Sequence, residues 1–416
     1  MNQKLRAHAE QIIRRSIEAV KPDAAVNRIL TQHPPVGNVY LVAAGKAAWK
    51  MAEEALRHIP QGIRGGVVIT KYDHVLHPLP GIDCYEAGHP VPDENGIRGT
   101  MAALELTKNL TQDDTVLFLL SGGGSALFEK PLIPLEELQT ITGQLLACGA
   151  DIVEMNTIRK RLSGVKGGRF AQWCAPARVK AIVLSDILGD PLDMIASGPA
   201  APDLSTCDQA LEIVRKYHLE ISDPIRQLLR QETPKELNNV GSFVIGSVRE
   251  LCHAAERVCQ ELGYETVFLT DQLCCEARHA GSFLASVLKS HGASPKPLAF
   301  LAGGETVVRL TGKGLGGRNQ EIALGAAEIL RGMEGAAVVS VGSDGTDGPT
   351  DAAGGYVDTD SFDEMVAAGY VPSAVLAEND AYHALKAIGG LIVTGPTGTN
   401  VNDITVALLD NTMIKK

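Results

Sequence analysis

The chain has 416 residues, which is too long for one ordinary hydrophobic core and predicts two or three domains. Hydrophobic residues make up 45% of it and charged residues 21%, a composition typical of a folded globular protein. The formal net charge of -11 argues against general binding of nucleic acid or anionic membranes by the whole surface, so an anion site must be a local basic cluster.

The eight cysteines form no CxxC pair and have no metal-ligand spacing with histidine, so we expect free thiols in a reducing cytoplasm. The N-terminal segment MNQKLRAHAEQIIRRSIEAV is an amphipathic helix pattern interrupted by charge, without the apolar centre of a signal peptide. No stretch approaches the roughly 18 apolar residues of a membrane span. These patterns predict a cytoplasmic protein without membrane contact.

Two polar residues in the first hundred are candidate ligand contacts. The run 38–44 has the pattern of a strand, Gly45 is placed for a turn, and apolar residues then recur at helical spacing. We expect Lys46 in the first turn of that helix, where a cation is unfavourable by a few tenths of a kcal/mol unless an anion lies nearby. Lys46 is therefore a candidate ligand-binding residue, with a solvated lysine as the alternative. For His89, in the segment YEAGHPVPDENG, a substrate contact and a loop-bracing hydrogen bond both remain open.

The chain is organised around the stretch TVLFLLSGGGSAL. Its apolar part, 115–120, predicts a strand buried on both faces, which passes directly into a loop. Glycines let the backbone approach a ligand closely, and the hydroxyl and N–H groups can donate to an anion such as phosphate. We assign five residues of this loop to a phosphate-bearing cofactor: Ser121, Gly122, Gly123, Gly124 and Ser125. A tight turn that packs on a neighbouring strand is the alternative.

The densest basic cluster lies in the segment EMNTIRKRLSGVKGGRF. It holds five basic residues within eleven positions: Arg159, Lys160, Arg161, Lys166 and Arg169. Because its glycines permit close backbone approach, we expect an oxyanion site there, to which Arg159 contributes a substrate contact. A solvated helix face is the alternative.

Carboxylates follow the next apolar run, 179–184. Asp186 and Asp190 come after the end of this predicted strand. Carboxylates in that position suit a hard cation that keeps most of its water, so Mg²⁺ is the expected ion. Asp193 is interpreted as a cap of the following segment.

We place a domain boundary near residue 238, because the stretch ISDPIRQLLRQETPKELNNV shows no strand pattern. This gives an N-terminal Rossmann-like domain, 1–238, with a parallel sheet between helices. The C-terminal domain, 239–416, is expected to be α/β with a mixed sheet.

A second glycine-rich loop, GKGLGGRN, is predicted in the C-terminal half. The runs 297–302 and 306–310 before it are expected to form a β-hairpin. The loop then brings Lys313 and Arg318 to the start of a helix. Glycines, a helix N-terminus and a guanidinium together predict an oxyanion site.

Acidic residues also follow the predicted strand 336–341. Asp344 leaves the strand first, so we assign Asp344 to chemistry and Asp347 to turn structure. The spacing does not match an EF-hand. A metal site, a general base and turn-forming aspartates are the open interpretations.

This inventory is the one that phosphoryl transfer requires: donors around phosphate oxygens, a cation bridge and a fixed acceptor hydroxyl. The standard nucleotide signatures are absent from the sequence. Neither Gly45-Lys46 nor Gly312-Lys313 follows the glycine that a P-loop has five positions earlier, and no protein-kinase catalytic loop occurs. ATP would therefore be held in a different way.

The motifs resemble those of a known family. AAGKAAWKMA, FLLSGGGSAL, LSDILGDPLDMIASGP, GKGLGGRNQE and SDGTDGPTDAAG occur in order over nearly the whole chain. They are similar to motifs of the class II glycerate 2-kinases, whose C-terminal half is called the MOFRL domain. The resemblance implies ATP-dependent phosphorylation of D-glycerate at its 2-hydroxyl, two α/β domains, and an active site in the cleft between them.

The resemblance also implies roles for individual residues. The family's lysine in the AGK motif falls on Lys46, the arginine of the GGRNQE motif on Arg318, and the aspartate of SDGTDG on Asp344. We expect Lys46 and Arg318, with Asn319, to hold the glycerate carboxylate and the migrating phosphoryl group, and Asp344 to orient or deprotonate the 2-hydroxyl. The nucleotide and its Mg²⁺ are assigned to the loop 121–125, to the catalytic Asp186, and to Asp190 and Lys313.

Two other functions are considered. A hydroxypyruvate reductase that uses NAD(P)H should show G-x-G-x-x-G after a strand, and Gly122 and Gly124 begin that pattern, but Leu127 replaces its third glycine. A non-enzymatic sugar-acid or phosphate-binding protein is the third interpretation. We expect small-molecule partners, no nucleic acid and no membrane, and a monomer or homodimer.

Overall fold

The computed structural model describes residues 1–59 and 62–413. By its internal contacts the chain divides into two compact units. The N-terminal unit comprises Pro22–Ile245, and the C-terminal unit comprises Met1–Lys21 together with the chain from Gly246 onward. No helix among the described residues is long and apolar enough to cross a membrane.

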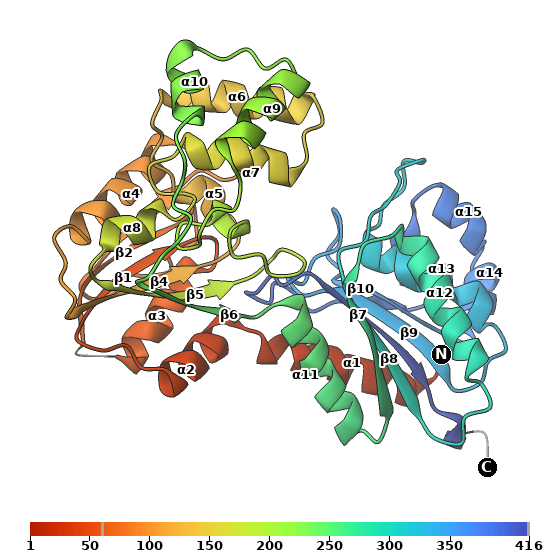
Figure 1. Cartoon of the computed structure of the whole chain (residues 1–416). Coiled ribbons are helices and arrows are strands. Elements are labelled where there is room, and N and C mark those ends of the chain that lie inside the picture. Colours follow the sequence, from red (N-terminus) through yellow and green to blue (C-terminus); the bar gives the residue numbers. More distant parts are fainter. Residues whose placement is uncertain (60–61, 414–416) are drawn as a thin grey trace. The chain divides into compact units, whose positions relative to one another are not determined.

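The N-terminal unit is built on a six-stranded parallel sheet (Figure 1). Its strands are β1 (Asn38–Ala44), β2 (Ile63–Lys71), β3 (Ile82–Ala87), β4 (Asp114–Leu120), β5 (Arg178–Leu184) and β6 (Val240–Ile245). They lie in the order β3-β2-β1-β4-β5-β6, and each neighbouring pair is parallel. Every residue of β4 is buried, as its apolar run predicted, because helices cover both faces of a parallel sheet. The predicted Rossmann-like sheet is confirmed.

Two groups of helices belong to this unit. Those against the sheet are α2 (Pro22–Gln32), α3 (Ala48–His58), α4 (Glu94–Leu106), α5 (Gly124–Leu127) and α8 (Arg169–Cys174). The others are α6 (Leu135–Ala147), α7 (Ile152–Arg161), α9 (Cys207–Lys216) and α10 (Asp223–Leu229). This second group packs around a core of its own that includes Leu138, Ile158 and Ile213, and it stands apart from the sheet in Figure 1.

The C-terminal unit contains a mixed sheet in the order β11-β10-β9-β12-β8-β7. Its strands are β7 (Glu265–Leu273), β8 (Leu298–Gly304), β9 (Ala336–Gly342), β10 (Gly354–Asp358), β11 (Leu391–Ile392) and β12 (Asp403–Leu409). Only β7 and β8 are parallel, and the remaining pairs are antiparallel. The predicted mixed α/β architecture is confirmed.

The predicted hairpin before the second glycine-rich loop does not form. Residues 306–310 are not a strand, and Val307 makes only an isolated bridge with Glu276. β8 lies between β12 and β7, so both of its edges are taken by strands other than the segment that follows it. A local turn pattern cannot reveal such partners.

Helices cover both faces of the mixed sheet. They are α1 (Gln3–Ala19), α11 (Val248–Glu261), α12 (Ala277–Ser290), α13 (Arg318–Leu330), α14 (Ser361–Ala367), α15 (Pro372–Ala377) and α16 (Ala381–Ala387). The two faces separate by the alternation along β8. Phe300 packs in the core with Leu284 of α12 and Leu330 of α13. A Cβ on Gly303, which points the other way, would lie 2.6 Å from Val248 of α11.

The two units do not divide where the sequence predicted. The boundary near residue 238 lies one strand too early, because β6 pairs with β5 from Val240 to Ile245. The first 21 residues, predicted in the N-terminal domain, belong to the C-terminal unit. There, the Met1 amino group binds Glu364 (2.7 Å) and Arg15 binds Glu261 (2.6 Å).

Candidate active site

The strand order of the N-terminal unit reverses between β1 and β4, which are parallel neighbours. In open α/β sheets, ligands bind outside the carboxyl ends of the strands at such a reversal. The loop after β1 contains Lys46, and the loop after β4 is the segment 121–125, called the glycine loop below. The Lys46 N–H donates to the Gly122 carbonyl (2.9 Å), and the Ala47 N–H donates to Ser121 Oγ (3.0 Å). The two loops are therefore fastened together.

The glycine loop leaves three backbone N–H groups without an acceptor. Gly123 has a left-handed φ of +87°, and the Gly124 N–H is taken by the Ser121 carbonyl (3.3 Å). Within the described part of the chain, the N–H groups of Gly122, Gly123 and Ser125 make no hydrogen bond. Successive N–H groups beside a left-handed residue form a concavity that suits an anion. The loop thus keeps the donors that a phosphate site needs.

Two side chains lie against this loop. A Cβ on Gly123 would be 3.0 Å from His89 Cδ2 and 3.3 Å from Lys46 Cγ. Burial, together with the positive charges of Lys46 and Lys71, lowers the pKa of His89 and so favours its neutral ring. Lys46 is exposed and makes no ion pair with the described residues. Since α3 begins at Ala48, Lys46 precedes the helix instead of lying in its first turn.

The acidic loop after β5 contributes carboxylates. A Cβ on Gly122 would lie 2.2 Å from Asp186 Oδ2, so this carboxylate packs on the glycine loop. Asp190 has a φ of +54°, and its buried Oδ1 has no hydrogen-bond partner among the described residues. Asp193, interpreted as a cap, instead pairs with Lys160 (3.0 Å). The described residues contain no group of three or more His, Cys, Asp or Glu side chains that could hold a metal ion. Two carboxylates still suit Mg²⁺, which keeps several waters.

Four of the five residues in the predicted basic cluster are held by the protein itself. Three are buried and paired with carboxylates: Lys160 with Asp193 and Asp203, Arg161 with Glu232, and Lys166 with Glu129. Arg169 Nη1 donates to the carbonyls of Lys160 and Ser163. For these four residues the predicted oxyanion site is wrong, and so is the alternative of a solvated helix face. Buried charges need partners, and these partners are distant in sequence.

Arg159 is the exception in that cluster. Its Nη2 donates to the Ser125 carbonyl (3.0 Å), which attaches the guanidinium to the glycine loop. Its Nε is buried and makes no hydrogen bond with the part of the chain that the structure describes. Burial lowers the pKa of Arg159, and the nearby Glu129 opposes this effect. A contact from Arg159 to the substrate stays a prediction.

In the C-terminal unit, Asp347 caps α13. Its carboxylate accepts hydrogen bonds from the N–H groups of Asn319 (3.1 Å) and Gln320 (2.9 Å). The Asn319 side chain is 1% exposed, donates to Asp347 (3.3 Å) and accepts from Ser340 Oγ (2.6 Å). Asn319 is therefore part of a buried network, and we remove it from the predicted substrate contacts.

Arg318 is held by two carboxylates. It donates to Asp403 through Nε (2.5 Å) and Nη2 (3.0 Å), and to Glu305 through Nη1 (3.0 Å). Burial raises the pKa of Asp403 to about 6, although Arg318 acts in the opposite direction. Burial also opposes the charge of Arg318, but Asp403 outweighs it and the guanidinium pKa is raised. The predicted oxyanion site at this helix start is thus filled by carboxylates of the chain.

The glycines before Arg318 serve packing. A Cβ on Gly312 would lie 2.3 Å from Glu378 Cα, and a Cβ on Gly314 would lie 2.4 Å from Asp380 Cβ. Lys313, assigned to the nucleotide, is exposed and makes no ion pair or hydrogen bond within the described chain. Its assignment stays a prediction.

Asp344 forms a local turn. Its Oδ1 accepts hydrogen bonds from the Thr346 N–H (2.9 Å) and the Thr346 hydroxyl (3.0 Å). Its Oδ2 has no partner among the described residues, so one carboxylate oxygen is available. Turn formation, which we assigned to Asp347, is therefore a role of Asp344, and the catalytic assignment of Asp344 stays a prediction.

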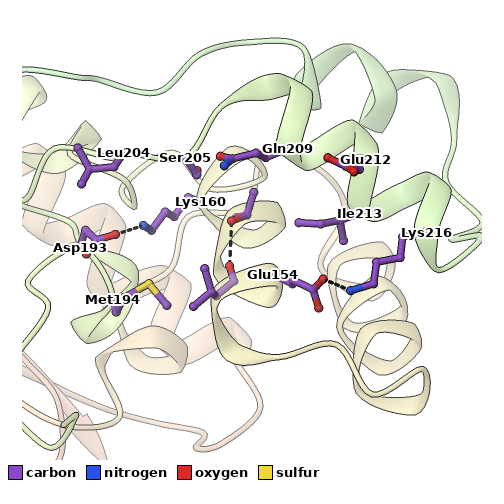
Figure 2. Close-up of a pocket in the computed structure, with 12 residues that line it drawn as sticks. Glu154, Lys160, Asp193, Met194, Leu204, Ser205, Gln209, Glu212, Ile213 and Lys216 are labelled. Atoms are coloured by element: carbon purple, nitrogen blue, oxygen red, sulfur yellow. Dashed lines mark hydrogen bonds and ion pairs between the residues drawn. The ribbon is translucent and has the colours of Figure 1, made fainter. Parts of the chain in front are cut away.

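A cavity of about 370 Å³ lies elsewhere in the N-terminal unit, among α7, α9 and the segment 193–205 (Figure 2). The ion pair of Lys160 and Asp193 lies at one side of it, and that of Glu154 and Lys216 (2.6 Å) at the other. No residue assigned to substrate, nucleotide or metal lines this cavity. It is therefore separate from the candidate site.

Comparison with known proteins covers both units. Residues 8–230 match a domain of unknown function (DUF4147), and residues 298–403 match the MOFRL family. The chain is 52% identical to D-glycerate 2-kinase from Thermotoga maritima, over 97% of this chain and 98% of that protein. It is 38% identical to a putative hydroxypyruvate reductase from Agrobacterium vitis, over 96% and 94% of the two chains. A crystal structure of glycerate kinase from Thermotoga maritima superimposes with a TM-score of 0.96, at 52% identity, over 98% of this chain and 100% of that one.

Proposed function

The chain belongs to the family of MOFRL-domain glycerate kinases, and on that premise we propose that it transfers a phosphoryl group from ATP to the 2-hydroxyl of D-glycerate. The products are 2-phosphoglycerate and ADP. The observation that supports the proposal lies at the reversal of the parallel sheet, where three N–H groups and the neighbouring Lys46 have no partner among the described residues. Phosphoryl transfer depends on such positioning and charge stabilisation.

The glycine loop and Lys46 form the phosphate-binding part of the proposed site. The N–H groups of Gly122, Gly123 and Ser125 hold phosphate oxygens, and Lys46 adds a positive charge that no carboxylate of the described chain neutralises. Arg159 holds the glycine loop in place by donating a hydrogen bond to the Ser125 carbonyl. Donors that are already in place need no reorganisation when the phosphoryl group is transferred. Such preorganised donors are a main source of electrostatic stabilisation of the transition state.

Asp186 and Asp190 are the residues that would hold Mg²⁺. The orphaned Oδ1 of Asp190 and the packing of Asp186 on the glycine loop fit an ion bound by carboxylates and phosphate oxygens. When bound, the ion neutralises charge on the phosphates of ATP. We assign no further role to Asp193, whose carboxylate is occupied by Lys160.

Two residues of the C-terminal unit complete the proposal. Arg318 contacts the migrating phosphoryl group or the glycerate carboxylate, and its contact with Glu305, whose side chain is 48% exposed, is the one exchanged for the substrate. The bidentate bond to the buried Asp403 keeps the guanidinium in place. Asp344 orients or deprotonates the 2-hydroxyl through its Oδ2, which no described residue contacts by a hydrogen bond.

An enolase-coupled assay without phosphoglycerate mutase tests the proposal. Only 2-phosphoglycerate feeds enolase directly, so we expect signal from D-glycerate and ATP in this assay. A signal that appears only after the mutase is added means phosphorylation at the 3-hydroxyl. Complete absence of ADP formation with D-glycerate contradicts the kinase function itself.

A hydroxypyruvate reductase is the second candidate, because the sheet has the strand order of dinucleotide-binding folds and one relative carries that name. The glycine fingerprint is nevertheless broken by Leu127, which is fully buried in α5. Oxidation of NADH with hydroxypyruvate, at a rate comparable to phosphorylation of glycerate, would favour this candidate. We also expect the protein in the cytoplasm, where its eight free thiols remain reduced.

A further inference from the structure

A turn with a strained backbone packs against the glycine loop. Ala196, Ser197 and Gly198 are three consecutive residues with left-handed φ values of +51°, +62° and +63°. This conformation is unfavourable for residues with a Cβ, and it clusters at functional sites where the surroundings enforce it. A Cβ on Gly124 would lie 2.7 Å from the Ala196 Cβ, so the turn packs directly on the loop. The turn thereby places the fully buried Ser197 against Ser125.

Three side chains form a hydrogen-bond relay at this point. Ser197 Oγ donates to Asn156 Oδ1 (2.8 Å), and Ser125 Oγ lies 3.2 Å from Ser197 Oγ. The Asn156 amide is oriented by Met194, whose sulfur faces Nδ2 at 3.9 Å and is an acceptor only. With the amide reversed, Oδ1 would face that sulfur without a donor. Ser197 therefore gives its one hydroxyl hydrogen to Asn156 and can only accept from Ser125.

The relay determines whether the Ser125 hydroxyl donates or accepts a hydrogen bond on the side that faces a ligand. Its hydrogen is directed inward to Ser197, so only lone pairs of Ser125 Oγ face the ligand. A phosphate oxygen without a hydrogen finds no partner there, whereas an alcohol hydroxyl does. Ser125 is partly exposed, so a ligand can reach it.

We propose that Ser125 Oγ accepts a hydrogen bond from a hydroxyl group of glycerate, and that Ser197 and Asn156 are positioning residues that fix this polarity. The inference deepens the proposed kinase function and rests on it. It also changes the sequence-based assignment of the Ser125 side chain to the nucleotide phosphates. The backbone N–H of Ser125 keeps its role in the phosphate site.

Ser125→Ala and Ser197→Ala test the proposal, with binding of D-glycerate and of ADP measured separately by calorimetry and their Michaelis constants measured alongside. Loss of one neutral hydrogen bond should weaken glycerate about 3- to 10-fold in Ser125→Ala, with ADP affinity unchanged. In Ser197→Ala the Ser125 hydrogen is free to turn outward, so glycerate should weaken while ADP binds as well or better. A merely structural role would weaken both ligands together.

Ser163→Ala is the matched control, because Ser163 is also fully buried but lies outside the relay. It should change neither affinity, and thermal unfolding should show all three variants folded. Weaker ADP with unchanged glycerate in Ser125→Ala would identify the hydroxyl as a phosphate or ribose contact and overturn the proposal. Equal losses for both ligands, or no change in either, would also overturn it. A wild-type protein inactive on glycerate contradicts the kinase function instead.

Discussion

Two glycine-rich loops, 121–125 and 312–317, look alike in sequence but differ in what occupies their donors. In the first, the N–H groups of Gly122, Gly123 and Ser125 are unused within the described chain. In the second, the helix start that follows is capped by Asp347, and the adjoining guanidinium is bound by two carboxylates. One loop is open to an outside anion, and the other carries anions supplied by the protein.

The difference teaches that a glycine-rich sequence does not by itself reveal what surrounds the loop. At Gly122 and Gly123 a Cβ would meet the side chains of Asp186, His89 and Lys46. At Gly312 it would meet the backbone of a neighbouring loop. The first pattern indicates approach to a site, and the second indicates packing. Variants of Lys46, beside the first loop, and of Arg318, at the end of the second, should therefore behave differently.

Arg318→Ala should have the largest effect, because it removes both the proposed contact with the substrate and the partner of the buried Asp403. We expect turnover to fall about 10²- to 10³-fold, as for loss of one preorganised donor. The free energy of unfolding should fall by about 3 kcal/mol, the lower end for breaking a buried pair, since a third of the Arg318 side chain is exposed. Urea unfolding at pH 7 and the enolase-coupled assay measure the two effects.

The double variant Arg318→Ala with Asp403→Asn separates the loss of turnover from the loss of stability. It no longer buries an unpaired carboxylate, so stability should recover in part while activity stays low. The stability loss of the single variant should also shrink at pH 5, where the isolated Asp403 is protonated. Full stability of Arg318→Ala at pH 7 would contradict the structural half of the comparison.

Lys46→Ala should lower turnover by a similar factor of about 10²- to 10³-fold, but leave stability within about 0.5 kcal/mol. The reason is that Lys46 is exposed and makes no ion pair with the described residues, so the folded state loses no contact of its charge. Lys50→Ala, an exposed lysine one turn along in α3, is the control and should change neither quantity. Near-normal turnover in Lys46→Ala would remove the lysine from the site.

The parallel sheet was predictable because its central strand β4 is an apolar run buried along its whole length, and β1 and β5 end in apolar residues. Such runs are typical of strands covered on both faces. The places of the glycine loop and of Lys46, each directly after a strand, were predictable for the same reason. The partners of the basic cluster could not be found. Lys166 reaches Glu129, and Arg161 reaches Glu232, 71 positions further along the chain. Whether a cation is free depends on these distant carboxylates, which no local pattern contains.

The pH dependence of stability gives a smaller effect that isolates Asp403. Burial raises its pKa to about 6, from an ordinary value near 3.8. The folded state therefore binds its proton more tightly than the unfolded chain, and this contribution is complete below about pH 4 and is lost as the pH rises to about 6. The slope is at most about 1.4 kcal/mol per pH unit. Unfolding free energies of wild type minus Asp403→Asn, measured from pH 4 to 7, should show it, and a flat difference would contradict it.

The smallest expected effect comes from two glycines that both have a left-handed backbone conformation but differ in their surroundings. Gly123 has a φ of +87° and Gly149 a φ of +75°, so alanine at either position should cost roughly 1 kcal/mol of stability. A Cβ on Gly149 meets no heavy atom within 4 Å, whereas a Cβ on Gly123 presses on His89 and Lys46. Only Gly123→Ala should therefore raise the Michaelis constants for ATP or glycerate, by about tenfold for a displacement worth 1.4 kcal/mol. Equal kinetics in the two variants would mean that Lys46 and His89 can move away without loss, and that the glycine loop is a packing turn like its counterpart at 312–317.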